Sequence, residues 1–266
     1  MSDCPARRTT IQWIRKREGI MGFGSRFCHV RGAKFLDAQH LTKTYRVGTE
    51  TVYALRDVNF AALQGDFVVI NGPSGSGKTT FLNLMSVIDR PTSGEVLIEG
   101  QPTSTQSEGQ LAYLRKTKIG LVFQSFNLIP VLSAAENVEY PLLLQRRPKA
   151  ERQERVAALL AEVGLSDLAR RRPNELSGGQ RQRVAIARAL VSGPMIVLAD
   201  EPTANLDSKT GEAVMDLMRK LNEEHCVTFI VVTHDPAVSR YAGRRVRIHD
   251  GRLEEGEGDG VAASSS

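Results

Sequence analysis

Short apolar runs alternate along the chain with segments whose apolar residues recur at helical spacing. The runs at 66–70, 195–201 and 228–234 read DFVVI, MIVLADE and TFIVVTH. Apolar runs of this length, rich in β-branched residues, are typical of parallel strands buried on both faces. Between them, 150–164 and 211–224 space their apolar residues at three and four, which predicts helices. Alternating strands and helices favour an α/β fold with a mainly parallel sheet.

The two ends of this pattern differ from its middle. AQHLTKTYRV and TVYALRDVNFAAL look like strands that are separated by a turn around Gly48. The segments 94–100 and 118–124 are further strand candidates, and from about 130 to 175 the pattern is helical. We therefore expect the folded body to begin near residue 37 and to end near residue 254.

Composition places this body among globular proteins. Hydrophobic residues make up 41% of the 266 residues, enough for a sizeable core. No apolar run approaches the roughly 20 residues of a membrane-spanning helix, and no signal-peptide core follows the N-terminus. Cys4, Cys28 and Cys226 are odd in number and form no CxxC pair, so we expect neither a disulfide framework nor a zinc site. These features favour a soluble, cytosolic protein.

Positive charge is concentrated at the N-terminus. The chain has a net charge of +5, whereas 1–36 alone hold eight basic and two acidic residues, or +6, so the remainder carries −1. A near-neutral body does not favour nucleic-acid binding. We expect 1–36 to be a disordered extension, and Met21 is a possible second start. The alternatives are a weak contact with a membrane surface or a partner, through Trp13 and the flanking basic residues, or an Arg-rich transit peptide. The segment 255–266 reads as a polar tail.

The stretch 72–80, GPSGSGKTT, follows the first apolar strand and precedes a helical segment. It fits G-x-x-x-x-G-K-[ST], in which backbone N–H groups curl around phosphates, the lysine adds a charge and the hydroxyl binds Mg²⁺. The second strand, MIVLADE, carries Asp200 to the sheet edge, where ligands of open α/β sheets bind. Asp200 can hold Mg²⁺ while Glu201, on the other side of the extended chain, takes a proton from attacking water. These parts predict an ATPase.

A second anion site is predicted at 176–180, LSGGQ, about a hundred residues later. Ser177 and the amides of Gly178 to Gln180 form a helix N-terminus with a positive dipole end. The alternative is an ordinary Ser-capped helix. Two glycines in a first turn cost about 1–2 kcal/mol relative to alanine, which argues against a purely structural role.

At this point the chain closely resembles the ATP-binding-cassette (ABC) family, of which LSGGQ is the signature. Tyr45 stands where the family places an aromatic that stacks on adenine, although Tyr53 competes for this role. Gln124 matches the glutamine at the edge of the helical subdomain. Asp207 matches the loop that crosses a dimer interface, and His234 matches the histidine that contacts the γ-phosphate.

The resemblance implies a P-loop NTPase core with a mainly parallel sheet, an antiparallel β subdomain and a helical signature subdomain at about 125–190, within 37–254. ATP and Mg²⁺ are the implied cofactors. The implied catalytic residues are Glu201, His234 and Gln124, and the implied metal ligands are Thr79, Gln124 and Asp200. The implied nucleotide-binding residues are Tyr45, Gly72, Pro73, Ser74, Gly75, Ser76, Gly77, Lys78, Thr79, Thr80, Ser177, Gly178, Gly179, Gln180 and Asp207.

The resemblance also implies partners. In the family, two cassettes face each other head to tail, and one chain's signature meets the ATP of the other. Stretches such as FQSFNLIPVLSAAENVEYPLLL and ADEPTANLDSKTGE resemble the lipoprotein-releasing, macrolide-exporter and cell-division ATPases. We therefore expect a transporter ATPase at the cytoplasmic face of the inner membrane, held by a separate permease, with no nucleic-acid partner. The alternative is a soluble ABC ATPase such as that of iron–sulfur cluster assembly. The sequence does not identify the cargo, whose selection we expect to depend on the permease.

Overall fold

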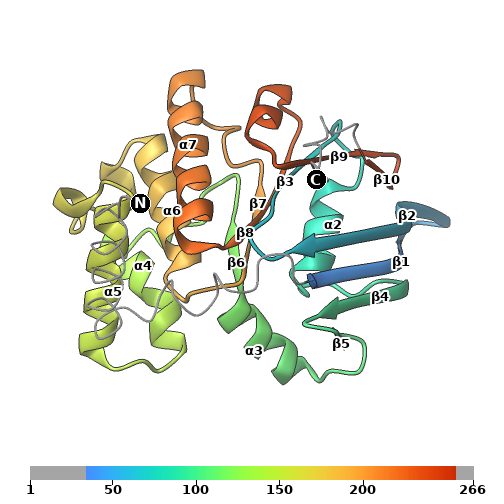
Figure 1. The fold of residues 1–266 in the computed structure, drawn as a ribbon, viewed down its shortest axis with the longest axis horizontal. Coiled ribbons are helices and arrows are strands. Elements are labelled where there is room, and N and C mark those ends of the chain that lie inside the picture. Colours follow the sequence, from blue (N-terminus) through green and yellow to red (C-terminus); the bar gives the residue numbers. More distant parts are fainter. Residues whose placement is uncertain (1–33, 256–266) are drawn as a thin grey trace, which may run out of the picture.

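The computed structural model describes residues 34–255 (Figure 1). The extension predicted at the N-terminus falls on 1–33 for most of its length, and nearly all of the predicted polar tail falls on 256–266, so both lie outside the described residues. The first strand, β1, begins at Lys34, slightly before the predicted start of the body. Leu36 is fully buried in this strand, so the core already includes the residues just before 37.

A six-stranded sheet forms the centre of the molecule, in the order β10-β9-β3-β8-β7-β6. Strands β9, β3, β8, β7 and β6 are parallel, and only β10 runs antiparallel to its neighbour. The prediction of a mainly parallel sheet is therefore confirmed. The strands are β3 (Phe67–Asn71), β6 (Ile119–Val122), β7 (Ile196–Asp200), β8 (Thr228–Thr233), β9 (Arg244–His249) and β10 (Arg252–Glu255).

A separate four-stranded sheet is antiparallel, in the order β2-β1-β4-β5. It lies beside the central sheet, on the right of Figure 1. The predicted strands around Gly48 are therefore present as the long hairpin of β1 and β2. The four strands are β1 (Lys34–Val47), β2 (Glu50–Leu63), β4 (Ser93–Ile98) and β5 (Gln101–Pro102).

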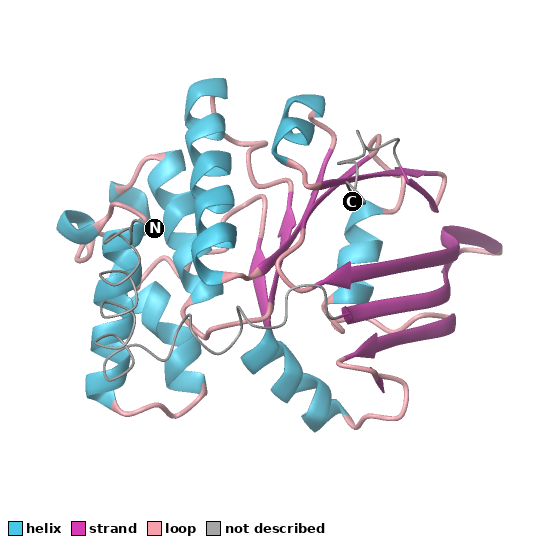
Figure 2. Ribbon diagram, in the orientation of Figure 1, coloured by secondary structure: helices cyan, strands magenta, loops and turns pink. Residues whose placement is uncertain are grey.

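The helices cover the central sheet on both faces (Figure 2). Helices α4, α5, α6 and α7 lie on one side, and α2 fills the space between the central and the antiparallel sheet. The helices are α2 (Lys78–Met85), α3 (Glu108–Lys118), α4 (Ala134–Leu144), α5 (Lys149–Glu162), α6 (Gly178–Leu190) and α7 (Ser208–His225). Short 3-10 helices span Ser166–Leu168, Pro173–Glu175 and Pro236–Tyr241.

Alternate residues of the central strands enter two different hydrophobic cores. In β3, Phe67 and Val69 pack with the helices α4 to α7, whereas Val68 and Ile70 pack with α2 and the antiparallel sheet. Successive side chains of a strand point to opposite faces, so a sheet covered on both faces needs an unbroken apolar run. This explains why the apolar runs, rather than strict alternation, predicted these strands.

No helix in the part of the chain that the structure describes is long and apolar enough to span a bilayer. Cys226, directly after α7, is disulfide-bonded, which is one bond and not the disulfide framework that the sequence argued against. An odd number of cysteines excludes complete pairing but does not exclude a single bond.

Candidate nucleotide-binding and active site

The loop at 72–77 joins β3 to α2 at the carboxyl end of the central sheet. Gly75 and Gly77 have φ values of 79° and 105°, in the left-handed region that favours glycine. A Cβ at Gly77 would overlap the carbonyl oxygen of Ala54, and one at Gly72 would overlap that of Ile248. The loop therefore depends on glycine both for its backbone conformation and for its close approach to β2 and β9.

Lys78 begins α2 and is buried beneath this loop, with 8% of its surface exposed. Its ammonium group donates to the carbonyl oxygens of Gly72 and Pro73, at 2.8 and 3.0 Å. The hydroxyl of Ser76 is also buried and has no protein partner. A positive charge and an unpaired donor inside a glycine loop form a cradle suited to phosphate oxygens.

Thr79 and Asp200 meet at the mouth of the loop, where the Thr79 hydroxyl donates to Asp200 Oδ2 at 3.2 Å. Burial raises the pKa of the Asp200 carboxyl, and the adjacent Glu201 charge acts in the same direction, against the Thr79 hydrogen bond and the Lys78 charge. A hydroxyl next to a carboxylate is a hard-oxygen set that fits Mg²⁺, which usually takes few protein ligands together with phosphate and water. Accordingly, the residues the structure describes form no cluster of three or more His, Cys, Asp or Glu side chains suited to a metal.

Glu201 follows β7 and is buried, with a left-handed φ of 47°. Its Oε2 accepts hydrogen bonds from the Thr233 hydroxyl at 2.9 Å and the His234 amide at 3.2 Å. Its Oε1 lies 3.7 Å from Lys78 Nζ. A non-glycine residue keeps this conformation only when neighbouring groups hold it there. For Glu201, these groups lie at the end of β8. The carboxylate is therefore fixed beside the phosphate loop.

His234 contacts the other oxygen of the same carboxylate, with its Nδ1 2.8 Å from Glu201 Oε1. Because an ionised carboxylate only accepts, Nδ1 is the donor in this pair. The imidazole side chain is 57% exposed, so its other nitrogen is accessible to a ligand. Glu201 and His234 thus form a dyad at the ends of neighbouring strands.

Two predicted site residues are not in contact with this group. Within residues 34–255, no hydrogen bond or ion pair joins the side chain of Gln124 to the phosphate loop or to Asp200. Gln124 is exposed, and its backbone carbonyl accepts from Asn205 Nδ2 at 2.9 Å. Tyr45 lies on β1 and donates its hydroxyl to Asp89 at 3.1 Å. The roles predicted for both side chains stay predictions.

The segment 177–180 forms the first turn of α6. Ser177 caps the helix reciprocally with Gln180: the Ser177 hydroxyl accepts from the Gln180 amide, and the Gln180 side chain accepts from the Ser177 amide. A Cβ at Gly179 would overlap the methyl carbon of Thr210 in α7, and one at Gly178 would lie 3.1 Å from a Leu206 methyl. Close packing against the start of α7 therefore requires glycine here, so the cost of the two glycines is not by itself an argument for a ligand, and the predicted anion-binding role stays a prediction.

Asp207 is the N-cap of α7, close to the same contact, and it accepts from the Thr210 amide at 3.0 Å. Hydrogen bonds from Thr210 lower the pKa of this exposed carboxyl. The two predicted motifs at 177–180 and 207 therefore lie side by side within one chain, at the starts of α6 and α7.

Two residues that contact the predicted site were not predicted from the sequence. Thr233 donates a hydrogen bond to Glu201, and Asn205 donates one to the backbone carbonyl of Gln124. Thr233 is the last residue of β8, and β8 pairs with β7 so that Val232 lies opposite Asp200. A polar residue that ends an apolar strand directly before His234 was the available signal for Thr233. No comparable signal indicated Asn205.

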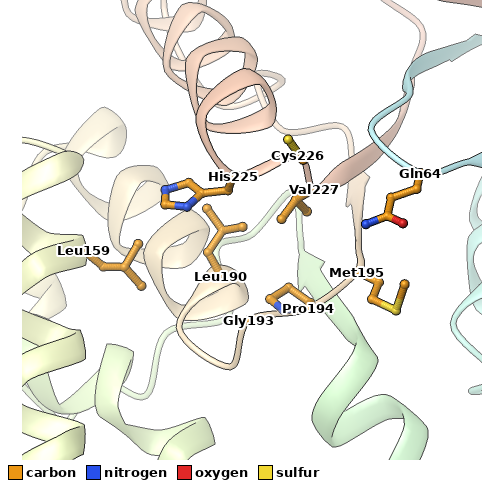
Figure 3. Close-up of a pocket in the computed structure, with 9 residues that line it drawn as sticks. All are labelled: Gln64, Leu159, Leu190, Gly193, Pro194, Met195, His225, Cys226 and Val227. Atoms are coloured by element: carbon orange, nitrogen blue, oxygen red, sulfur yellow. The ribbon is translucent and has the colours of Figure 1, made fainter. Parts of the chain in front are cut away.

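A different cavity lies near the amino ends of β7 and β8, on the edge of the sheet opposite the phosphate loop (Figure 3). Its volume is about 20 Å³, and Leu159, Leu190, Met195 and Val227 contribute to its largely apolar lining. A space of this size holds one water molecule at most. It is not a candidate for the nucleotide site.

Comparison with known proteins identifies relatives over most of the chain. The family model described as ABC transporter matches residues 55–204. The uncharacterized ABC transporter ATP-binding protein MJ0796 of Methanocaldococcus jannaschii is 50% identical over 223 residues, which cover 82% of this chain and 95% of that protein. A structure of MJ0796, as a dimer in a post-hydrolysis state bound to ADP and Pi, matches with a TM-score of 0.76 and 48% identity, over 84% of this chain and 99% of that one.

A larger relative shares the same region. The macrolide export ATP-binding/permease protein MacB of Syntrophobacter fumaroxidans is 48% identical over 225 residues, which cover 84% of this chain but 32% of MacB. The similarity thus extends over one part of a protein whose name also includes a permease.

Proposed function

The chain belongs to the ABC transporter family, and from this premise we propose that it is the ATP-binding and ATP-hydrolysing subunit that powers a separate membrane permease. It works as a head-to-tail homodimer with two nucleotides at the interface. The dimeric structure of MJ0796 with ADP and Pi and the ATP-binding/permease name of MacB support this proposal. Cargo is selected by the permease rather than by this chain.

The phosphate loop and Lys78 bind the triphosphate of ATP. Backbone N–H groups of the loop donate to phosphate oxygens, and the Lys78 ammonium exchanges its carbonyl partners for phosphate. Thr79 and Asp200 are the protein ligands proposed for Mg²⁺, and Gln124 remains a third candidate. When bound, the metal neutralises developing charge on the phosphates.

Glu201 is the proposed general base, and the geometry of its carboxylate is the observation that carries the proposal. Water attacks the γ-phosphorus, the bond from that phosphorus to the bridging oxygen breaks, and Glu201 takes the proton of the water. Thr233 and the His234 amide fix one carboxylate oxygen, and the His234 ring contacts the other. His234 thereby both orients the base and presents its second nitrogen to the phosphate.

Glu201→Gln tests this assignment. The variant keeps the shape of the side chain and loses the proton acceptor, so we expect ATP binding to persist and turnover to fall about 10²–10⁴-fold. Steady-state phosphate release and equilibrium ATP binding are the measurements. Glu254→Gln, on β10 and away from the site, is the matched control. Near wild-type turnover in Glu201→Gln would move the base role to another group, with His234 the first candidate.

The permease is proposed to bind an open groove of about 670 Å³ between α3, the end of β6, α4 and α6. Phe123, Ile129, Tyr140 and Leu144 contribute to its mostly apolar lining. Tyr140 and Leu144 are 40% and 53% exposed, so the groove presents apolar surface to solvent. An exposed apolar groove next to Gln124 suits a short amphipathic helix of the permease.

Leu144→Glu tests this docking site and the proposed location at the cytoplasmic face of the membrane. In the native host, we expect wild type in the membrane fraction and Leu144→Glu in the soluble fraction, because a charge in the groove opposes apolar burial. Leu144→Met is the matched control, and the ATP affinity of both purified variants should equal that of wild type. A wild-type chain found wholly in the soluble fraction would favour the alternative of a non-transport ATPase.

A further inference from the structure

The side chain of Tyr45 is held in place by charged groups that the proposed mechanism does not use. Tyr45 lies near the end of β1, with 40% of its surface exposed. Its hydroxyl donates to Asp89 Oδ2 at 3.1 Å. Asp89 lies a few residues beyond α2, far from Tyr45 in sequence. An exposed tyrosine on a strand usually samples several orientations, but this hydrogen bond selects one.

Lys43 completes the arrangement. Its ammonium lies 2.7 Å from the Asp89 carboxylate, donates to the Arg90 carbonyl at 2.8 Å and lies 5.1 Å from the centroid of the Tyr45 ring. The Lys43 side chain is only 13% exposed, so it does not swing freely into solvent. A cation at this distance is attracted to an aromatic face. One face of the Tyr45 ring is thus occupied, and its edge is anchored.

The backbone supports the same contact between β1 and the segment after α2. The Thr44 amide donates to the Thr92 hydroxyl at 3.0 Å, and the Thr92 amide donates to the Thr42 carbonyl at 2.8 Å. Helix α2 begins with Lys78, in the phosphate cradle. A single helix therefore joins the phosphate cradle to the support of the Tyr45 ring.

Tyr53, the other candidate for the base platform, lacks this support. Tyr45 pairs with Val52 across the hairpin and Tyr53 pairs with Thr44, so the two rings lie on opposite faces of the sheet. The ring of Tyr53 is covered by Arg56, whose guanidinium carbon is 4.5 Å from the centroid. In the described residues, no carboxylate is bonded to the Tyr53 hydroxyl.

We propose that Lys43 and Asp89 are positioning residues that preset the Tyr45 ring, so that one free face receives the adenine base. This inference rests on the proposed role of Tyr45 in binding ATP. The Asp89 carboxylate anchors the hydroxyl, and the Lys43 ammonium blocks the second face and draws electron density of the ring toward itself. The base then stacks on a ring that loses little rotational freedom on binding.

Asp89 is ionised at neutral pH, as this role requires. Partial burial acts to raise its pKa, but hydrogen bonds from Lys43, the Arg90 amide and Tyr45 outweigh burial and lower it. The carboxylate therefore accepts from the ammonium and the phenol at the same time.

Two ligands separate base binding from phosphate binding: MgADP has the base, whereas magnesium pyrophosphate has only phosphates. MgADP affinity is measured by calorimetric titration of the full-length chain, and pyrophosphate affinity by competition. We expect Tyr45→Phe and Asp89→Ala each to weaken MgADP about 3–10-fold, as expected for loss of a partly exposed hydrogen bond to a charged group. The double variant should be no weaker than the weaker single variant, because both changes break the same bond. Lys43→Met should also weaken MgADP, and pyrophosphate affinity should stay within about twofold of wild type in all four variants.

Glu99→Gln is the control, because it removes another Lys–carboxylate ion pair, Lys118–Glu99, which is more exposed and distant from Tyr45. It should leave MgADP affinity unchanged. Additive effects of Tyr45→Phe and Asp89→Ala, or an equal loss of pyrophosphate affinity, would overturn the inference. If Asp89→Ala folds poorly, Tyr45→Phe still tests the inference, because Tyr45→Phe removes only one oxygen atom. Tyr45→Ala distinguishes failure of the proposed base-binding role of Tyr45 from failure of the positioning role of Lys43 and Asp89. If Tyr45→Ala leaves MgADP affinity unchanged, Tyr45 does not bind the base. If Tyr45→Ala weakens MgADP but Tyr45→Phe and Asp89→Ala do not, only the positioning role is refuted.

Discussion

Adjacent residues of the site differ sharply in their surroundings, as Asp200 and Glu201 show. Asp200 ends β7 and meets a threonine hydroxyl, whereas Glu201 turns into a left-handed conformation and meets Thr233 and His234. Their surroundings suit the two different roles proposed for these neighbouring carboxylates, one toward a metal and one toward water. The division arises from the backbone turn between them rather than from their chemistry.

Gly179 is needed for packing, whatever its part in ligand binding. It is buried, and its lack of a Cβ lets α6 approach Thr210 of α7. A loss of function on substitution of this glycine is therefore not by itself evidence of ligand contact.

Gly179→Ala should lower the free energy of unfolding by about 1–3 kcal/mol, the usual cost of overpacking. Thr210→Ser removes the methyl carbon that the new Cβ would overlap, so the double variant should regain most of that stability. Chemical denaturation followed by circular dichroism measures both effects. A Gly179→Ala variant as stable as wild type would show that the two helices separate at little cost.

Helix α6 links the two functional regions of the molecule. It begins at the signature, and near its other end Arg188 donates to the carbonyls of Asn127 and Phe126 at 2.5 and 2.9 Å. Phe126 and Asn127 both have left-handed φ values, 60° and 48°, and lie two and three residues after Gln124. Burial lowers the pKa of the Arg188 guanidinium, which nevertheless stays charged. The strained segment at 124–127 is thus held by the helix that carries the signature.

Arg188→Met should release this segment while keeping the apolar packing of α6. We expect amide hydrogen exchange at 124–128 to quicken about tenfold or more, since two hydrogen bonds from a charged donor are lost. Arg183→Met, on the same helix and bonded to Val163 instead, is the matched control. Unchanged exchange at 124–128 would mean that the remaining contacts, among them the Asn205 bond to Gln124 and the Arg181 contact with Phe126, hold the segment without Arg188.

At the scale of the whole molecule, the signature and the phosphate loop serve different nucleotides in the proposed dimer. Within one chain, Ser177 and Gln180 satisfy each other, and Gly178 and Gly179 pack beside Asp207 and Thr210. The Glu201 dyad is built from other elements, the ends of β7 and β8. In the proposed dimer, the partner chain brings its signature to the phosphate that each loop binds.

Ser177→Arg tests this arrangement in trans. The variant should bind MgATP as well as wild type, because its own phosphate loop is intact, and it should fail to form an ATP-trapped dimer in a Glu201→Gln background. Light scattering measures the dimer, and equilibrium titration of the monomer measures binding. Ser166→Arg, at an exposed position before α6, is the matched control. If Ser177→Arg abolishes MgATP binding to the monomer, the signature acts in cis and the proposed dimer is wrong.

The sequence by itself determined the elements whose signals are local. The apolar runs predicted β3, β7 and β8 because a strand buried on both faces needs an unbroken run. The phosphate loop could be predicted from 72–80 because its glycines, lysine and hydroxyl act within one turn of chain. The order of the sequence motifs also indicated the family, and the family model and the relatives bear this out.

Only the tertiary structure decided which distant residues meet. Thr233 and His234 hold Glu201 because β8 pairs with β7, and strand order is not written in any one segment. Gly179 needs its missing Cβ because α7 approaches α6 closely, a contact set by packing between helices. Lys43 and Asp89 support Tyr45 because the segment after α2 is bonded to β1. Each of these contacts joins residues far apart in sequence, so it depends on the assembled cores rather than on local pattern.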